Sequence, residues 1–224
     1  MAAPRRPRRG KAPLSRERIV GAALALVERD GLAAFSTRTL GRALRVEAMS
    51  LYHFFPSKQH LVDAMVDQVV GAFPFPDERL PALERMRLAC HAYRAMVHRH
   101  PNFFPVLAVH RHNTETGVRF IERLLDIARD ITGDDELAAR HFRTLGYYLV
   151  GTGLDETAGY AKGPSAAVPV SDEFIARKCP LLARSARYFQ RSEWDKTFEL
   201  GLETMLAGLT PTRSSPAASR KRRR

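Results

Sequence analysis

Side chains that could contact nucleic acid gather in one stretch of the sequence, from Thr37 to Lys58. From Ala48 to Phe54, small or polar residues alternate with residues that can donate or stack, and a helix with such an outward face suits the major groove of DNA. Its leading turn would meet base edges, while Tyr52 and Lys58 would reach phosphates. The stretch therefore favours DNA recognition, although a plain helical hairpin would have the same spacing.

A preceding short helix would position this reading helix. Leu40, Ala43 and Leu44 recur at the spacing of one helical face. Thr37 is a good N-cap, because its hydroxyl can accept a hydrogen bond from a free amide of the first turn. We expect residues 45–47 to break the helix, which makes the pair a helix-turn-helix. Polar residues expected to cap other helices are Ser15, Ser57, Asp134, Ser171 and Ser192.

The segment GLAAFSTRTLGRALRVEAMSLYHFFPSKQHLVDAM resembles the DNA-binding domain of the TetR family of bacterial transcriptional regulators. The points of resemblance, in register without a gap, are Gly31, Phe35, Thr37, Arg38, Leu40, Ala43, Val46, Leu51, Tyr52, Phe54, Lys58 and Leu61. The resemblance implies a homodimer that binds double-stranded operator DNA through the second helix of the motif. The DNA-binding residues that it implies are Thr37, Arg38, Ala48, Met49, Ser50, Tyr52, His53 and Lys58.

Two features of the motif bear on what it would read. Ala48 has no hydrogen-bonding side chain and can offer only a methyl contact, so Ser50 and His53 would carry much of the polar readout. Arg45 stands where the TetR family usually has glycine. The turn tolerates another residue there if its φ angle stays negative.

The positive charge of the chain is concentrated at its two ends. The net charge of the 224 residues is +12, with five cations in residues 1–12, six in residues 210–224 and no acid in either. We expect both ends to be disordered: a basic arm at 1–12 that adds non-specific phosphate contacts or only aids solubility, and a basic tail at 210–224. Between them we expect a DNA-binding domain at 13–73 and a ligand-binding and dimerisation domain at 77–209, separated by a proline-rich break.

The larger domain shows helical periodicity and no strand pattern, so the predicted fold class is all-α, with nine or ten helices. The segments LVGTGLDETAGYA and FELGLETMLAGL resemble the paired long helices of the tetracycline-repressor type of C-terminal domain. That resemblance implies a four-helix dimer interface and a small-molecule pocket in each subunit. The interface residues that we expect are Gly146, Leu149, Gly153, Phe198, Leu202 and Met205.

Aromatic walls with a few polar groups are typical of small-molecule sites. The residues that could line such a pocket, each of which could also be ordinary core, are Tyr93, Phe103, Phe104, Leu107, His110, Phe120, Tyr147 and Asp155. The sequence does not name the effector.

Five histidines lie close in sequence and invite a metal interpretation: His91, His98, His100, His110 and His112. No cysteine pair joins them at zinc spacing, so we expect neither a metal nor a cofactor. The metal-chelating histidine of the tetracycline repressors has no unambiguous counterpart, and its acidic partner could be Asp155 or Glu156. Tetracycline and magnesium are therefore not inferred.

These features favour a ligand-responsive, sequence-specific DNA-binding regulator, most simply a repressor released from its operator by a small molecule. One alternative is an architectural protein that binds DNA non-specifically through its basic ends. Another is an enzyme, such as a hydrolase using Asp155, Glu156 and a histidine, but no phosphate loop, nucleophile elbow or HExxH motif is present, and we expect no enzyme activity. No apolar run reaches the ~20 residues of a membrane span. Cys90 and Cys179 fit buried free thiols, and we expect a bacterial cytoplasmic protein at the nucleoid.

Overall fold

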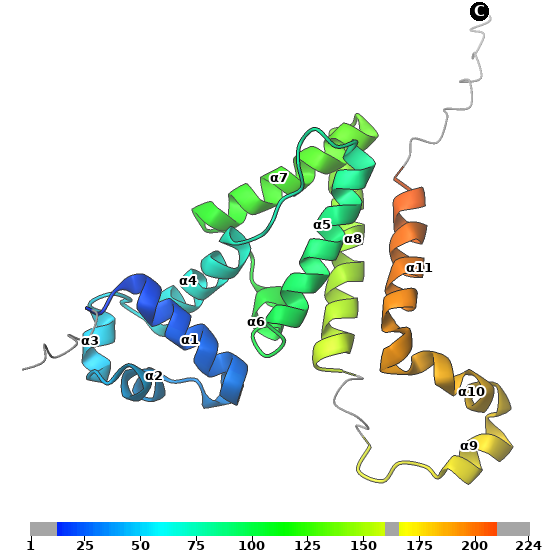
Figure 1. Ribbon diagram of the computed structural model, residues 1–224, viewed down its shortest axis with the longest axis horizontal. Coiled ribbons are helices and arrows are strands. Elements are labelled where there is room, and N and C mark those ends of the chain that lie inside the picture. Colours follow the sequence, from blue (N-terminus) through cyan, green and yellow to red (C-terminus); the bar gives the residue numbers. More distant parts are fainter. Residues whose placement is uncertain (1–12, 160–165, 210–224) are drawn as a thin grey trace, which may run out of the picture. The chain divides into compact units, whose positions relative to one another are not determined.

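The computed structural model describes residues 13–159 and 166–209, and every regular element within them is a helix (Figure 1). The fold class is therefore all-α, as predicted, with eleven α-helices in the described residues where the sequence suggested nine or ten. The basic ends at 1–12 and 210–224 lie outside the described residues. No helix in the described part is long and apolar enough to cross a membrane.

The chain divides into two compact units, residues 1–68 and 69–224. The division falls inside α4 (Lys58–Gly71), ahead of the proline-rich break at 74–76 where the sequence predicts a domain boundary. One continuous helix thus begins in the first unit and ends in the second.

Four helices form the first unit: α1 (Arg16–Asp30), α2 (Thr37–Leu44), α3 (Ala48–Tyr52) and the start of α4. Ser15 caps α1 as predicted, because its Oγ accepts a hydrogen bond from the amide of Arg18 at 3.2 Å. The apolar side of each helix contributes to a small core. Its most completely buried members include Ile19, Leu40, Leu51, Leu61 and Met65.

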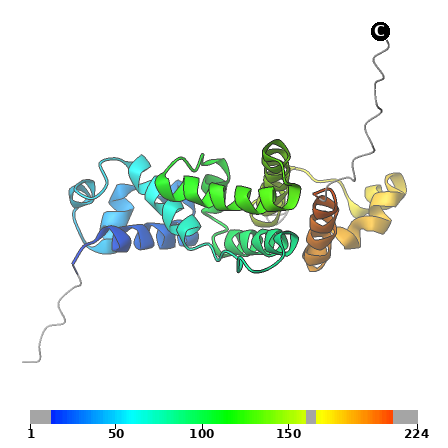
Figure 2. The same ribbon diagram turned by 90° about the horizontal axis from the view of Figure 1, so that it is seen from above.

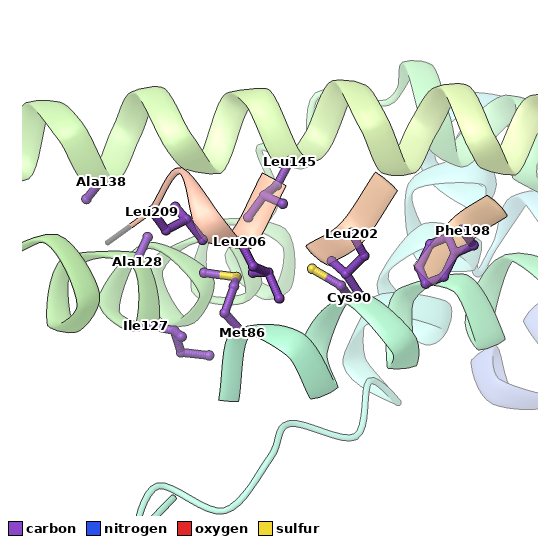
Figure 3. Packing of buried hydrophobic residues seen from close by; sticks show 10 residues of the cluster. All are labelled: Met86, Cys90, Ile127, Ala128, Ala138, Leu145, Phe198, Leu202, Leu206 and Leu209. Atoms are coloured by element: carbon purple, nitrogen blue, oxygen red, sulfur yellow. The ribbon is translucent and has the colours of Figure 1, made fainter. Parts of the chain in front are cut away.

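The described part of the second unit continues with α5 (Ala82–Arg99), α6 (Phe104–Val109), α7 (Glu115–Thr132), α8 (Asp135–Thr157), α9 (Asp172–Lys178), α10 (Pro180–Ser185) and α11 (Trp194–Ala207). α5, α7 and α8 pack on one another, and α11 lies along α5 and α8 (Figure 1 and Figure 2). Figure 3 shows the core of these four helices, formed by Met86, Cys90, Ile127, Ala128, Ala138, Leu145, Phe198, Leu202, Leu206 and Leu209.

Side-chain caps set several helix ends where the sequence predicted them. Asp134 and Ser171 accept hydrogen bonds from the backbone amides three residues further on, at 2.8 Å and 3.2 Å. Ser192 is an exception. A short 3-10 turn carries the chain past it, α11 begins at Trp194, and the side chain of the N-cap residue Glu193 accepts no capping hydrogen bond from the helix backbone.

Residues 166–193, the exposed apolar segment, contain no buried side chain. α9, α10 and the 3-10 turns nearby instead expose large apolar residues, among them Phe174, Leu181, Leu182, Tyr188 and Phe189. Cys179 lies in this segment and is partly exposed, so the prediction of a buried thiol is wrong there, whereas Cys90 is buried as predicted.

Candidate DNA-contacting helix and ligand cavity

The first helix of the motif is fixed by a reciprocal cap at Ser36. Its Oγ accepts a hydrogen bond from the amide of Thr39 at 3.1 Å, and the amide of Ser36 donates to Thr39 Oγ1 at 3.0 Å. Thr37 is therefore the first helical residue, and its prediction as the N-cap is wrong. The reason is chemical: a polar side chain stands three residues after Ser36, whereas Leu40 stands three residues after Thr37.

The turn between α2 and α3 is left-handed at Arg45, whose φ is 57° and ψ 47°. The negative φ that would make arginine easy to accommodate is not found. Such a conformation costs a non-glycine residue about 1–2 kcal/mol. The turn is held by the amide of Val46, which donates to the carbonyl oxygen of Gly41 at 2.9 Å.

Gly41 permits the close approach of the two helices. An added Cβ would lie 2.9 Å from the carbonyl oxygen of Val46 and 3.3 Å from the Cα of Ala48, and neither backbone atom can rotate away. Sequence reasoning did not single out Gly41, although a glycine within a short helix is itself an indication that another backbone passes nearby. Ala43, assigned to the buried face, is exposed, while Leu40 and Leu44 are buried.

The reading helix α3 is short and anchored by one side chain. Leu51 is 2% exposed, whereas Met49 is 71% and Tyr52 40% exposed, so one face of α3 is anchored in the core and another is accessible. α3 ends at Tyr52, two residues before the predicted end, but His53 keeps helical backbone angles and is exposed. Ala48 and Ser50 are partly exposed. The residues predicted to meet bases thus remain accessible.

The side chains predicted to reach phosphates lie at the start of α2, the end of α3 and the start of α4. Arg38 is exposed, Thr37 is partly exposed, and the Lys58 Nζ lies 3.4 Å from the carbonyl oxygen of Phe35. Arg16, which sequence reasoning missed, stacks over the Phe55 ring at 4.2 Å and hydrogen-bonds the carbonyl oxygen of Phe54. It braces the end of the reading helix against α1, and its spacing in the sequence gave no indication of this.

The second unit contains a cavity of about 740 Å³, a volume within the usual range of small-molecule sites. Residues from α5, α6, α7, α8 and the loop at 110–112 line it. Burial raises the pKa of Tyr93 to about 12 and that of the Cys90 thiol to about 12, so both stay protonated at neutral pH. Five residues predicted to line a pocket do so: Tyr93, Leu107, His110, Phe120 and Tyr147.

The other three predicted pocket residues lie elsewhere. Phe103 and Phe104 are fully buried in the packing between helices and do not reach the cavity, so their assignment is wrong. Asp155 is exposed and also does not line it. Each residue of a helix turns by ~100°, and the neighbour of Asp155, Glu156, is the one that points inward.

The residues expected at a dimer interface are occupied within the single chain. Phe198 and Leu202 are 1% and 0% exposed and belong to its own core, so their assignment to the interface is wrong. Gly153 is buried, and an added Cβ would lie 2.6 Å from Phe104 Cε1. The remaining three are also in use: Gly146 and Leu149 line the cavity, and Met205 packs against the core. An apolar stripe shows that a face is buried, not which chain buries it.

A buried charge network joins α5, α8 and α11. The guanidinium of Arg94 donates two hydrogen bonds of 2.9 Å to the Glu156 carboxylate, which is 4% exposed, and a third of 2.8 Å to Asp195. His98 Nε2 lies 2.6 Å from the same Glu156 carboxylate. Burial alone would lower the pKa of Arg94, but the hydrogen bonds to both carboxylates outweigh it and raise this pKa.

The histidines considered for a metal are spread over different surroundings. His98 is bound to Glu156, and His91 Nε2 is 3.6 Å from Glu199. Within the described ranges, no three His, Cys, Asp or Glu side chains are arranged to hold a metal ion.

The first unit presents an exposed helix in a helix-turn-helix, and the second unit is helical and contains a cavity. Together these two features define a class of DNA-binding regulators with a small-molecule site. Residues 19–65 match the family of bacterial regulatory proteins named tetR, and residues 77–213 match the tetracyclin repressor-like C-terminal domain. The chain therefore belongs to the TetR family of transcriptional regulators, a family of regulators rather than of enzymes.

Individual relatives cover the chain to different extents. The transcriptional repressor DrrR1 of Streptomyces coeruleorubidus is 41% identical over 66 residues, which are 29% of this chain and 24% of that protein, so the chain spans about a quarter of its length. The class A tetracycline repressor of transposon 1721 from Escherichia coli is 27% identical over 87% of this chain and 90% of its own. The structure of ActR from Streptomyces coelicolor in complex with actinorhodin shares 29% identity, with a TM-score of 0.70 over 88% of this chain and 97% of that chain.

Proposed function

We propose that this chain is a homodimeric repressor that leaves a palindromic operator when a small molecule fills the cavity of the second unit. The observation that carries the proposal is the cavity itself. A DNA binder without regulation needs only the first unit, yet the chain adds a unit with a cavity of about 740 Å³. The similarity to ActR, whose structure is a complex with actinorhodin, supports a small-molecule ligand for this chain.

The DNA-contacting residues follow from exposure and charge. Met49, Ser50 and His53 would meet base edges, and Arg38 and Lys58 would meet phosphates. Five residues of α3 read only a few base pairs. Two copies related by a two-fold axis would read half-sites ~34 Å apart, which requires a palindrome.

Exposed apolar surface supports the homodimer. The exposed apolar segment (166–193) leaves Leu181 at 69% exposure, and on α11 Leu200 is 72% exposed, on the side opposite the buried Leu202. Surfaces of this kind mark interaction sites. We propose that α11 meets the partner subunit through the face of Leu200, so that Leu200→Glu yields monomers in sedimentation velocity, whereas Leu202→Glu unfolds the chain.

The path from cavity to DNA runs through α4. Phe73 lies two residues after the end of α4, lines the cavity and packs edge-on against Phe120 with ring centroids 5.1 Å apart. A ligand that displaces Phe73 would move α4, whose first residues belong to the reading unit. Phe73→Ala should keep operator affinity but lose release by ligand.

The proposal places the protein at the nucleoid in the bacterial cytoplasm, where operator DNA lies, and gives the second unit a binding task rather than catalysis. The rival function is non-specific, architectural DNA binding. Selection of duplexes from a random library by the full-length protein, followed by anisotropy titrations of the selected and a scrambled duplex at the same salt concentration, separates the two. A repressor should prefer the selected duplex by at least ~1,000-fold, and equal affinities would contradict the proposal.

A further inference from the structure

The polar part of the cavity lining carries positive charge and hydrogen-bond donors. Besides the Cys90 thiol, its polar side chains are Tyr93, His110, Arg111, His112, Arg143 and Tyr147. No Asp or Glu occurs among the described lining residues. Cations without a nearby carboxylate lower the free energy of a bound anion and raise that of a bound cation.

The two arginines of the lining keep their charge available. Neither Arg111 nor Arg143 forms an ion pair with a described residue, whereas Arg140, one turn earlier on α8, lies 2.7 Å from Glu136. The guanidinium of Arg143 stacks over the Tyr147 ring at 4.8 Å, which orients it without neutralising it. A guanidinium in this state can bind a carboxylate or sulfonate through two parallel hydrogen bonds.

Two further polar side chains lie in the lining. The backbone amide of His112 donates to His110 Nδ1 at 3.0 Å, which orients the His110 ring. Tyr93 remains a phenol at neutral pH, because burial raises its pKa to about 12. The Tyr93 hydroxyl makes no hydrogen bond to any described residue.

The apolar part of the lining is rich in rings. Phe73 and Phe120 cross edge-to-face at 5.1 Å, and the His112 ring is 6.1 Å from that of Phe120. Ring walls of this kind bind flat aromatic ligands by stacking and edge contacts. The volume of about 740 Å³ accommodates a ligand of several fused or linked rings.

We propose that the cavity binds a flat aromatic acid, whose ionised group meets Arg111 and Arg143 directly and whose rings lie against Phe120 and His112. This inference rests on the proposed function, in which the same cavity receives the effector.

The test uses two fluorescent probes with the same rings, anilinonaphthalene sulfonate and neutral phenylnaphthylamine. Each is titrated into the full-length protein without DNA. The sulfonate should bind at least ~10-fold more tightly, and Arg143→Gln should remove ~10-fold of that affinity while leaving the neutral probe within ~2-fold. Arg140→Gln, on the same helix but outside the cavity, is the matched control and should change neither.

A second pair of variants shows where the probes bind. An added Cβ at Gly146 or at Gly151 meets nothing within 4 Å, but only Gly146 lines the cavity. Gly146→Trp should therefore abolish binding of both probes, and Gly151→Trp should leave it intact. Arg111→Gln should act like Arg143→Gln.

Three outcomes overturn the inference. Equal affinity for the two probes would reject an acidic ligand while leaving the effector site in place. Full binding to Gly146→Trp would show that the probes bind outside the cavity. Sulfonate binding that disappears with a chelator and returns with magnesium would show that a metal, not the arginines, meets the charge. The proposed function fails separately, if no cavity ligand changes operator affinity.

Discussion

Arginines are used differently in the two units of this protein. In the first unit, Arg38, Arg42 and Arg45 are exposed on α2 and its turn and form no ion pair with a described residue. In the second unit, all three arginines of α7 pair with carboxylates, and Arg87 and Arg94 each pair with two. Arg87, Arg94 and Arg129 thereby pair with carboxylates of other helices, whereas the unpaired arginines of α2 and its turn are free to meet an anion from outside the chain.

The two arginines of the cavity resemble those of α2 in having no ion pair with a described residue. Arg111 and Arg143 line it unpaired, although their unit otherwise supplies many carboxylates. An arginine without an internal partner is available to an external anion, and we propose that those of α2 and of the cavity bind one. Phosphates would be the external anions for α2, and an acidic ligand for the cavity.

The largest effect is expected where a paired arginine loses its partner. Glu156→Ala should lower the free energy of unfolding by about 3 kcal/mol, because Arg94 stays in place without its buried carboxylate. Glu136→Ala removes the partner of Arg140 from an exposed pair and should cost less than ~0.5 kcal/mol. Urea unfolding followed by circular dichroism measures both. Similar losses for the two variants would show that the network does not hold the helices together.

Replacing a base-reading side chain should have the next largest effect. His53→Ala should change which duplex is preferred, with a loss of about 1–3 kcal/mol at one position of the operator. Lys58→Ala should weaken all duplexes alike and flatten the salt dependence, because a phosphate contact carries no sequence information. Competition titrations with single-base operator variants distinguish them. If instead Lys58→Ala changes the preferred duplex and His53→Ala weakens all duplexes alike, the reading helix is rotated from the orientation proposed.

Arg45 combines backbone strain with a free charge, and its replacement should separate the two. Arg45→Gly relieves the left-handed conformation and should stabilise the protein by up to about 1 kcal/mol, after the greater freedom of glycine in the unfolded chain is counted. Operator affinity should fall in the same variant, because a cation is lost. Arg45→Asn, which also tolerates this conformation, is the control for charge. If Arg45→Gly is less stable than the parent protein, the claim that the backbone at Arg45 is strained is wrong.

The smallest effect is expected for a single unpaired arginine on α2. Arg42→Ala should reduce the slope of log affinity against log salt by about 0.9. Arg29→Ala should leave the slope unchanged, because Arg29 pairs with Asp30 at 2.6 Å. Anisotropy titrations over a range of salt concentrations provide both slopes. A change of slope in Arg29→Ala alone would reverse the proposed difference between paired and unpaired arginines.

Features decided within a few residues could be predicted from the sequence. The helix-turn-helix, the caps at Ser15, Asp134 and Ser171, and the all-α fold all depend on local spacing and local hydrogen bonds. Even locally, neighbouring residues compete for the N-cap position of a helix. Ser36 displaced Thr37 as the cap because it has a polar side chain three residues on.

Features that depend on how the helices pack against one another could not be predicted from the sequence. Leu202 and Phe198 repeat at helical spacing, and that pattern is the same whether a partner subunit or the protein's own α5 and α8 covers them. The cavity residues Arg111 and Arg143 have no distinctive spacing either. They become recognisable only when folding leaves them beside a cavity and without a carboxylate.

The central claim is that cavity and operator are coupled through one dimer. The most direct measurement is the affinity of an aromatic acid, chosen by its displacement of anilinonaphthalene sulfonate, for the free protein and for the operator-bound protein. If the ligand lowers operator affinity 100-fold, the operator must weaken ligand binding by the same factor, about 2.7 kcal/mol. Equal ligand affinities in the two states would contradict the account and leave the second unit as a dimerisation domain alone.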